Sequence, residues 1–229
     1  MPVMYKSLLT TEQNRRQARW REVAGSFVIT DYGESDTDRE QAFSNLSFID
    51  LSPLPRVGIR GKDLSQWTNS KNYVVGTQSN YAYAQHDGVL IARLSPGELM
   101  LLADPADPSV VISANSIAAT HKCYPVRRQD SHYWFALTGE CSPVMFAKLC
   151  GVDLSPDVFV NHSTAQTSVA RTSAVIVRHD INEVLCYYLL GDSSTILYMW
   201  TCILDAVSEF NGQVLGLRAM HSLTGPTGE

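Results

Sequence analysis

The chain has 229 residues, of which 45% are hydrophobic and 18% are charged, so it can bury a substantial core as one large domain or two small ones. Its formal net charge of -5, from 18 Lys and Arg against 23 Asp and Glu, provides no basic surface for a phosphate backbone, and we expect no nucleic-acid partner. No apolar run reaches the roughly 18 residues of a membrane helix, and the start has neither an apolar signal core nor a small-residue cleavage site, so we expect a cytoplasmic protein with no membrane contact.

The first forty residues predict an arm outside the main domain. Residues 10–24 indicate a helix with basic side chains around Trp20, and the acidic stretch "DYGESDTDRE" that follows is typical of a solvated loop. These features fit an ordinary surface helix and linker. They also fit an arm that docks on another subunit, with Arg15, Arg16 and Trp20 as the partner interface. We expect residues 1–42 to form this arm and linker, and we place the main domain at 43–212.

The same order of elements occurs twice in the main domain. In the first copy, "LPRVGIRG" alternates like a half-buried strand, "KDLSQWTNS" predicts a short helix, and "YAYAQHDGVLIARLSPGELMLLAD" predicts strands with turns at "HDG" and "SPGE". A helix is expected after "DPADP". In the second copy the strand "HYWFALTG", the helix "ECSPVMFAKLCG", three further strands and the helix "SSTILYMWTCILDAVSEF" follow in the same order.

This order predicts two pseudo-repeats, at about residues 54–120 and 130–212. Gly61 and Gly139 occupy equivalent places in the two copies, and so do Asp104 and Asp192. Each unit would leave one sheet face apolar, and packing the two faces together buries both. The expected fold class is α+β, with the two units packed together and residues 213–229 left as a flexible tail.

Cys141 and Cys150 lie at the two ends of the helix expected within "LTGECSPVMFAKLCGVDLSP", which Ser142 caps and Gly151 ends. At about 1.5 Å rise per residue the thiols are roughly 13 Å apart, too far for a disulfide or a shared metal. Core packing explains the apolar face of this helix, which comprises Met145, Phe146, Leu149 and Cys150. A helix N-terminus lowers the pKa of a nearby thiol, which leaves Cys141 as a candidate reactive group.

The last helix of the second copy is the strongest predicted core element. Asp192 or Ser193 can cap its start. Its apolar residues recur at helical spacing, with Leu197 and Leu204 widening a stripe formed by Ile196, Trp200, Ile203, Val207 and Phe210.

The common mechanistic motifs are absent. The sequence has no Gly-rich phosphate loop, no GxSxG elbow and no HExxH. His121 and Cys123 supply two candidate metal ligands, which do not make a site. Paired carboxylates in an apolar context do not occur near either sheet. We therefore expect no metal and no catalytic residue, and we expect the cleft between the two units to hold no proton-handling group.

Three stretches of the second copy resemble the gamma subunit of heterotetrameric sarcosine oxidase, a relative of the folate-binding glycine cleavage T-protein. They are "LTGECSPVMFAKLCGVDLSPDVF", "AQTSVARTSAVIV" and "YYLLGDSSTILYMWTCILDAVSEF", and "FSNLSFIDLSPLPRVGIRGKDL" is similar to the opening of the folate-binding domain in that superfamily. The resemblance covers about residues 43 to 210. It implies two ferredoxin-like units related by a pseudo-twofold axis, packed as in the folate-binding domain of the T-protein.

The sequence departs from the T-protein pattern at the positions that carry chemistry. That family has an acidic pair after a Gly-Gly turn, in a segment resembling "GGVIDDL", where this chain has "DGVLIARL" with Ile91 and Ala92. Its folate-binding stretch has an Arg followed by a Gly-Glu and a later Glu. Arg171 matches the Arg, no Gly-Glu follows, and Glu183 is the substitute, so these two residues are the expected folate contacts.

The resemblance implies two functions from different classes. The first is an accessory, non-catalytic gamma-type subunit of a complex that oxidises sarcosine or a related N-methyl amine. Larger partner subunits would hold flavin and NAD, and tetrahydrofolate would take up the one-carbon unit. The second is a stand-alone enzyme that transfers a methyl or aminomethyl group to tetrahydrofolate. Saturable binding of tetrahydrofolate by the isolated chain would favour the second function.

Overall fold

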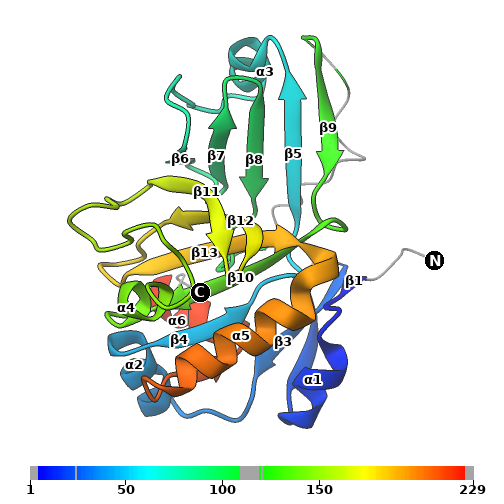
Figure 1. Cartoon of the computed structure of the whole chain (residues 1–229). Helices are drawn as coiled ribbons and strands as arrows, with labels where there is room; N and C mark the ends of the chain where they lie inside the picture. Colours follow the sequence, from blue (N-terminus) through cyan, green and yellow to red (C-terminus); the bar gives the residue numbers. More distant parts are fainter. Residues whose placement is uncertain (1–4, 24, 109–118, 120, 225–229) are drawn as a thin grey trace.

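The computed structural model of the chain describes residues 5–23, 25–108, 119 and 121–224, which form a five-stranded, a six-stranded and a three-stranded sheet with flanking helices (Figure 1). The structure is therefore α+β, as the sequence predicts. The helix expected after "DPADP" falls on residues 109–118, outside the described part of the chain. Within the described residues, no helix is long and apolar enough to cross a membrane.

The five-stranded sheet contains the strands predicted for the first copy. It has the order β6-β7-β8-β5-β9 and is antiparallel throughout. The predicted strand "LPRVGIRG", the short helix and the later strands are confirmed as β5 (Arg56–Gly61), α3 (Leu64–Ser70), β6 (Tyr81–Ala84), β7 (Leu90–Ser95) and β8 (Glu98–Leu102), and β9 (Cys123–Arg127) completes the sheet.

The six-stranded sheet contains the strands predicted for the second copy. It has the order β11-β12-β13-β10-β4-β14. Its elements are β4 (Ser47–Asp50), β10 (His132–Thr138), α4 (Ser142–Phe146), β11 (Thr164–Val169), β12 (Thr172–Arg178), β13 (Cys186–Asp192), the 3-10 turn η2 (Ser193–Thr195), α5 (Ile196–Ser208) and β14 (Gln213–Leu215).

The strand orders of these two sheets correspond. β5 lies between β8 and β9 in one sheet, and β10 lies between β13 and β4 in the other, antiparallel to both neighbours in each case. β4 precedes β5 along the chain but pairs with β10, whereas β9 precedes β10 but pairs with β5. Each half therefore supplies its first strand to the sheet of the other half, and the chain crosses between the sheets twice.

Two glycines sit at matching close approaches in this arrangement. A Cβ atom at Gly61, which ends β5, would lie 2.3 Å from the carbonyl oxygen of Lys122, just before β9. A Cβ atom at Gly139, which follows β10, would lie 2.5 Å from the carbonyl oxygen of Asn45, just before β4. The sequence analysis placed these glycines at equivalent points, and the structure gives them the same steric role.

The core has three parts. The largest lies between the two sheets and contains Ala92, Met100, Leu102, Trp134, Val177, Tyr188 and Leu190 among others. A second part lies under α5 on the other face of the six-stranded sheet, and a third lies under α3. Four stripe positions of α5 are buried as predicted, namely Ile196, Trp200, Ile203 and Val207. Leu197 is 55% exposed, so its placement in the stripe is wrong: it lies about 100° around the helix from Ile196.

The predicted helix over residues 10–24 is wrong beyond its first two turns. α1 (Thr10–Arg15) ends at the cap Arg16, and Gln17 then adopts a left-handed φ of 61° that no helix continues through. The chain reverses into β2 (Arg19–Val23), which pairs with β3 (Ser26–Asp31), and β1 (Tyr5–Lys6) completes the three-stranded sheet. This region is folded rather than an arm and linker.

The expected solvated loop "DYGESDTDRE" also contains a helix. α2 (Asp36–Ser44) starts at Ser35, whose side chain accepts from the N–H of Asp38 while the Asp38 carboxylate accepts from the N–H of Ser35. This reciprocal capping is readable as Ser-x-x-Asp before a helix. The acidic composition of the stretch favoured the prediction of a solvated loop instead of this helix.

The expected flexible tail over 213–229 is wrong as far as residue 224. β14 adds to β4 in parallel, and α6 (Leu217–Thr224) packs Leu217, Ala219, Met220 and Leu223 into the core between the sheets. Residues 225–229 lie outside the described part of the chain. Four buried apolar side chains at helical spacing give α6 the burial that a mobile tail lacks.

The helix between Cys141 and Cys150 is shorter than predicted. Cys141 rather than Ser142 is the N-cap, Pro143 lies in the first turn, and α4 ends at Phe146 rather than before Gly151. The five cysteines, all within the described residues, are free thiols. Met145 and Phe146 are fully buried, and Cys150 is 8% exposed, so the predicted apolar face packs into the core under α5.

Candidate functional site

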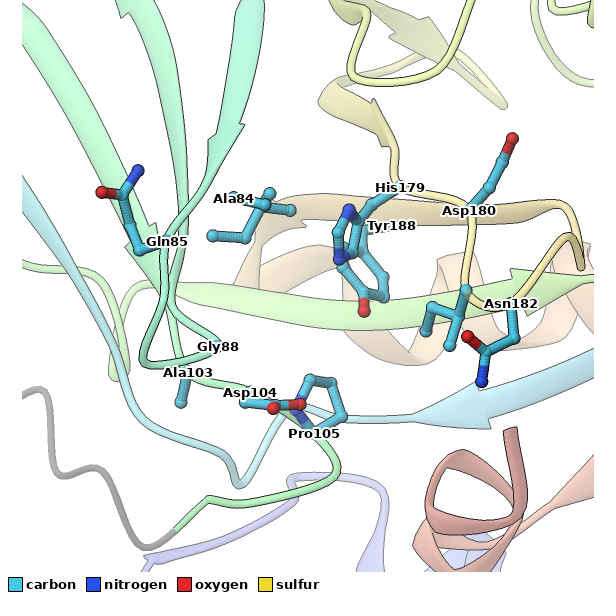
Figure 2. Close-up of a pocket in the computed structure, with 12 residues that line it drawn as sticks. Ala84, Gln85, Gly88, Ala103, Asp104, Pro105, His179, Asp180, Asn182 and Tyr188 are labelled. Atoms are coloured by element: carbon cyan, nitrogen blue, oxygen red, sulfur yellow. The ribbon is translucent and has the colours of Figure 1, made fainter. Parts of the chain in front are cut away.

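A cavity of about 290 Å³ lies where one end of the five-stranded sheet meets a turn of the six-stranded sheet. Its walls come from the turn between β6 and β7, from the residues after β8, from the turn between β12 and β13, and from Tyr188 on β13. Figure 2 shows Asp104 and Pro105 on one side of this space and His179, Tyr188 and Asn182 on the other. The site thus joins residues from both halves of the chain.

Asp104 is the carboxylate of the cavity. It follows the buried end of β8, and its Oδ1 accepts the backbone N–H of Ala106 at 2.8 Å, which holds the side chain in a tight turn. Burial raises the pKa of Asp104, although hydrogen bonds from the N–H groups of Ala106 and Asp107 act in the opposite direction. The carboxylate is therefore poorly hydrated for a charged group.

Gly88 allows Asp104 to occupy this position. Its φ of +78° belongs to the left-handed region, and its N–H donates to the carbonyl of Gln85 in the turn between β6 and β7. A Cβ atom at Gly88 would lie 2.4 Å from Oδ2 of Asp104. A side chain at residue 88 would displace the carboxylate.

The turn between β12 and β13 is held by polar contacts at both ends. The guanidinium of Arg178 pairs with Asp180 at 2.6 Å and also donates to the carbonyls of Pro156 and Phe159. Asn182 donates to the carbonyl of Leu223 on α6 at 2.5 Å. The Asp180 charge is thus already neutralised, and the turn is fixed against the C-terminal helix.

Aromatic rings line the inner wall. The rings of His162 and His179 stack with centroids 5.5 Å apart, and the His179 ring lies 6.0 Å from that of Tyr188. Burial lowers the pKa of His179 to about 4, with His162 adding to the effect, so the imidazole is neutral at pH 7. Burial raises the pKa of Tyr188, which stays protonated.

Two polar atoms of this wall lack a nitrogen or oxygen partner. The Tyr188 hydroxyl and the Nδ1 atom of His179 are buried and form no hydrogen bond with a nitrogen or oxygen of any described residue, and the Tyr188 hydroxyl contacts only the Cys186 thiol. Unsatisfied buried polar atoms are uncommon in folded proteins and call for an explanation. Here they lie beside a cavity, where an occupant can satisfy them.

This group is not evident from the sequence. The expectation that no proton-handling group lies between the two units is wrong, because Asp104, His179 and Tyr188 line the cavity there. In the sequence Asp104 stands out only as a residue at an equivalent point of the repeat. The one local signal was the pair of turn motifs "HDG" and "DPADP", which said nothing about the distant strand that carries Tyr188.

Arg171 and Glu183, the expected folate contacts, do not come together. Both are exposed and have left-handed φ values, 64° and 69°. Arg171 lies in the turn between β11 and β12, and Glu183 lies in the turn between β12 and β13. They are therefore at opposite ends of β12 (Thr172–Arg178), and only Glu183 is near the cavity, next to Asn182.

Ile91 and Ala92 are core residues of β7. Both are fully buried, Ile91 under α3 and Ala92 between the two sheets. β7 therefore presents no acidic side chain at these two positions. Neither residue lines the cavity, whereas Gly88 and Asp104 do.

The expected partner residues lie together on the N-terminal segment. Arg15 is 70% exposed at its side chain and pairs with Glu12 on the same helix, and Arg16 is exposed at the helix end. The indole N–H of Trp20 donates to Asn14 at 2.9 Å, which ties β2 to α1. Within the described ranges, no group of three or more His, Cys, Asp or Glu side chains could hold a metal ion.

No protein-family model and no curated protein sequence matches the chain. Among solved structures, it resembles glycine cleavage system aminomethyltransferase T from Bartonella henselae with a TM-score of 0.73 at 14% identity, over 96% of this chain and 62% of that chain. It thus spans less than two thirds of that protein.

The chain also resembles a chain of the heterotetrameric sarcosine oxidase from Corynebacterium sp. U-96 in complex with pyrrole 2-carboxylate. The TM-score is 0.62 at 16% identity, and the match covers 77% of this chain and 92% of that chain. These likenesses establish a T-protein-like fold.

Proposed function

We propose that the chain is an accessory subunit, of gamma type, in a cytoplasmic heterotetrameric complex that oxidises sarcosine or a related N-methyl amine. Larger partner subunits carry the flavin and NAD, and tetrahydrofolate accepts the one-carbon unit released. The observation that carries the proposal is the likeness to a chain of a heterotetrameric sarcosine oxidase over 92% of that chain. Because only 77% of this chain is covered, the matched chain is the shorter of the two.

The interior of β7 supports a non-catalytic role. The T-protein pattern has an acidic pair where Ile91 and Ala92 stand, and both side chains are fully buried in apolar clusters. A carboxylate could not occupy either position without losing its hydration. The chain would therefore contribute shape and contact surface to the complex rather than an acid or base at this point.

The proposed partner surface consists of Arg15, Arg16 and Trp20, extended by Leu8, which lies two residues before α1 and is 71% exposed. Trp and Arg are enriched among the residues that contribute most to protein interfaces, and here the two arginines are exposed and Trp20 is partly exposed. The Asp50 carboxylate accepts from Ser7 and from Gln13, each at 2.5 Å, which fixes this segment to β4. The surface is thus presented by a rigid element.

Isolation of the tagged chain at native expression levels tests this role. We expect it to co-purify in a fixed ratio with a larger subunit that shows flavin absorbance and oxidises sarcosine. Replacing Arg16 and Trp20 together by Glu and Ala should release that subunit, whereas Tyr198→Ala, at an exposed aromatic residue on α5, should not. Recovery as a lone monomer with no flavoprotein contradicts the proposal.

The cavity supports a second candidate, a stand-alone tetrahydrofolate-dependent methyl or aminomethyl transferase. The cavity contains a carboxylate, a tyrosine hydroxyl and a neutral imidazole, which could orient a folate and a donor amine. Glu183 follows the lining residue Asn182, whereas Arg171 is at the other end of β12 and could contact only a ligand long enough to extend along that strand. Calorimetric titration with tetrahydrofolate separates the two candidates. Saturable one-to-one binding by the isolated chain, lost in Asp104→Asn, would favour the transferase.

A further inference from the structure

We propose that the cavity between the end of β8 and the β12–β13 turn binds a small organic cation, a protonated amine or an amidinium, through the Asp104 carboxylate and the Tyr188 hydroxyl. This goes beyond the proposed accessory role, which needs no ligand on this chain. Figure 2 shows both side chains facing the same space, with Asn182 beside them.

The charge of Asp104 has no counterion in the described part of the chain. The ion pairs that these residues form all involve other carboxylates, including the one between Arg178 and Asp180 at the rim. His221 interacts with the Asp104 carboxyl, but it hydrogen-bonds the backbone of Pro105, and burial lowers its pKa, which favours the neutral ring. The cavity therefore contains one uncompensated negative charge.

The Tyr188 hydroxyl is a second, independent indication of an occupant. The side chain is 1% exposed and lines the cavity, and among the described residues its hydroxyl has no nitrogen or oxygen partner and contacts only the Cys186 thiol, a weak hydrogen-bonding group. It is close enough to Asp104 for the carboxylate charge to raise its pKa. A ligand nitrogen carrying two or more N–H groups could donate to the carboxylate and to this hydroxyl oxygen together.

The remaining lining determines the class of ligand. The amide nitrogen of Asn182 is engaged by Leu223, which leaves its oxygen as the free acceptor, and the unpartnered Nδ1 of His179 belongs to a neutral ring. The Asp104 carboxylate and the Asn182 oxygen are acceptors and no lining residue is a cation, so an anion would be repelled while a donor-rich cation would be bound. A volume of about 290 Å³ is at the small end of ligand pockets and limits the occupant to a small molecule.

The turn role of Asp104 alone does not account for this arrangement. Asp153 makes the same local contact, since its Oδ1 accepts the N–H of Ser155 at 2.9 Å, but it does so at the surface. Asp104 makes it in a cavity that Tyr188 also lines, and it lies against Gly88. Asp153 is therefore the matched control for the charge of Asp104.

The test is a titration of the full-length protein, labelled with nitrogen-15, with piperidinium chloride and with cyclohexanol, a neutral ring of similar size. We expect saturable shifts of the Gly88, Ala106 and Asn182 amides with piperidinium and none with cyclohexanol. Asp104→Asn, which keeps the oxygen that caps the turn, should weaken binding at least tenfold. Asp153→Asn should leave the affinity within twofold of the wild type.

Tyr188→Phe provides the second variant. It should weaken piperidinium binding at least threefold while the stability of the free protein changes by less than about 1 kcal/mol, because the hydroxyl that it removes contacts only the weakly hydrogen-bonding Cys186 thiol. Equal affinity of Asp104→Asn and wild type, equal binding of cyclohexanol, or shifts that map elsewhere would each overturn the proposal. None of these results affects co-purification with a flavoprotein, so the two proposals fail separately.

Discussion

Replacing Arg56 by methionine should destabilise the whole fold, although Arg56 does not line the cavity that is proposed to bind a ligand. The side chain is 2% exposed and starts β5, where the chain has just crossed from one sheet to the other. Its guanidinium donates to the carbonyls of Ser52 and Leu54, at 2.7 and 2.8 Å, in that first crossing. It also donates to the carbonyls of Gln129, at 3.0 Å, and His132 in the second crossing.

The magnitude follows from these four contacts. Hydrogen bonds from a charged donor contribute about 1.5 to 3 kcal/mol each, and burial of the guanidinium offsets much of their sum. Burial lowers the pKa of Arg56 to about 10, so the group remains charged at pH 7. Removing one side of a buried charged network typically costs about 3 to 5 kcal/mol, and we expect Arg56→Met to fall in this range.

Urea unfolding followed by tryptophan fluorescence measures this loss. With an m-value of about 3 kcal/mol per molar, the midpoint should fall by about 1 to 2 M. Arg60→Met is the matched control on the same strand, because Arg60 is 48% exposed and pairs with Glu98 at the surface, and it should cost less than about 1 kcal/mol. A loss below about 1 kcal/mol for Arg56→Met would refute the view that this guanidinium holds the two crossings together.

Four further outcomes are expected. Trp200→Ala removes a 2% exposed indole packed on Phe48 and should cost about 3 to 5 kcal/mol, whereas Leu197→Ser on the exposed face should be nearly neutral in the same urea assay. His179 has a pKa of about 4 in the folded protein against 6.5 unfolded, so the unfolded state binds the proton first. The free energy of unfolding should thus be fully retained above pH 6.5 and fall by about 3 kcal/mol as the pH drops to 4. A smaller fall for the His179→Gln variant over the same pH range would show that His179 causes this loss. Gly88→Ala should destabilise the protein and, by displacing Asp104, weaken cation binding in the nitrogen-15 titration. Ile91→Asp should unfold the protein rather than create an acid site, as circular dichroism would show.

Local patterns predicted eight of the eleven strands that the described residues form in the two larger sheets and did not predict β4, β9 and β14. The alternation in "LPRVGIRG" and the stripe of α5 come from neighbours a few residues apart, so each is visible in a short window. α6 was missed because its apolar residues follow the short strand β14 near the end of the chain, where composition alone resembles a tail. The N-terminal sheet was missed because the left-handed turn at Gln17 has no signal in the residue type.

The cavity could not be predicted because its residues meet only through long-range pairing. Asp104 and Tyr188 are brought together by the packing of β8 and β13 from different sheets, and no spacing in the sequence relates them. The sequence also does not indicate that β4 and β9 are exchanged between the halves, because each strand directly precedes, along the chain, the half to whose sheet it does not belong. The resemblance to the T-protein family predicted the overall fold, while its site residues Arg171 and Glu183 lie at opposite ends of a strand.

The predicted effect of Ile91→Asp distinguishes a lost active site from a position that now serves only packing. Ile91 is fully buried against α3, beside Leu64 and Trp67, so a carboxylate there would be desolvated without a partner. The lost apolar burial costs about 1.5 to 3 kcal/mol, and an uncompensated buried charge adds several more. This sum is comparable to the whole stability of a typical domain, so circular dichroism should show an unfolded or insoluble chain. If the variant instead folds with a stability within about 1 kcal/mol of the wild type, the strand can accept an acid, and the argument that packing excludes catalysis at this point fails.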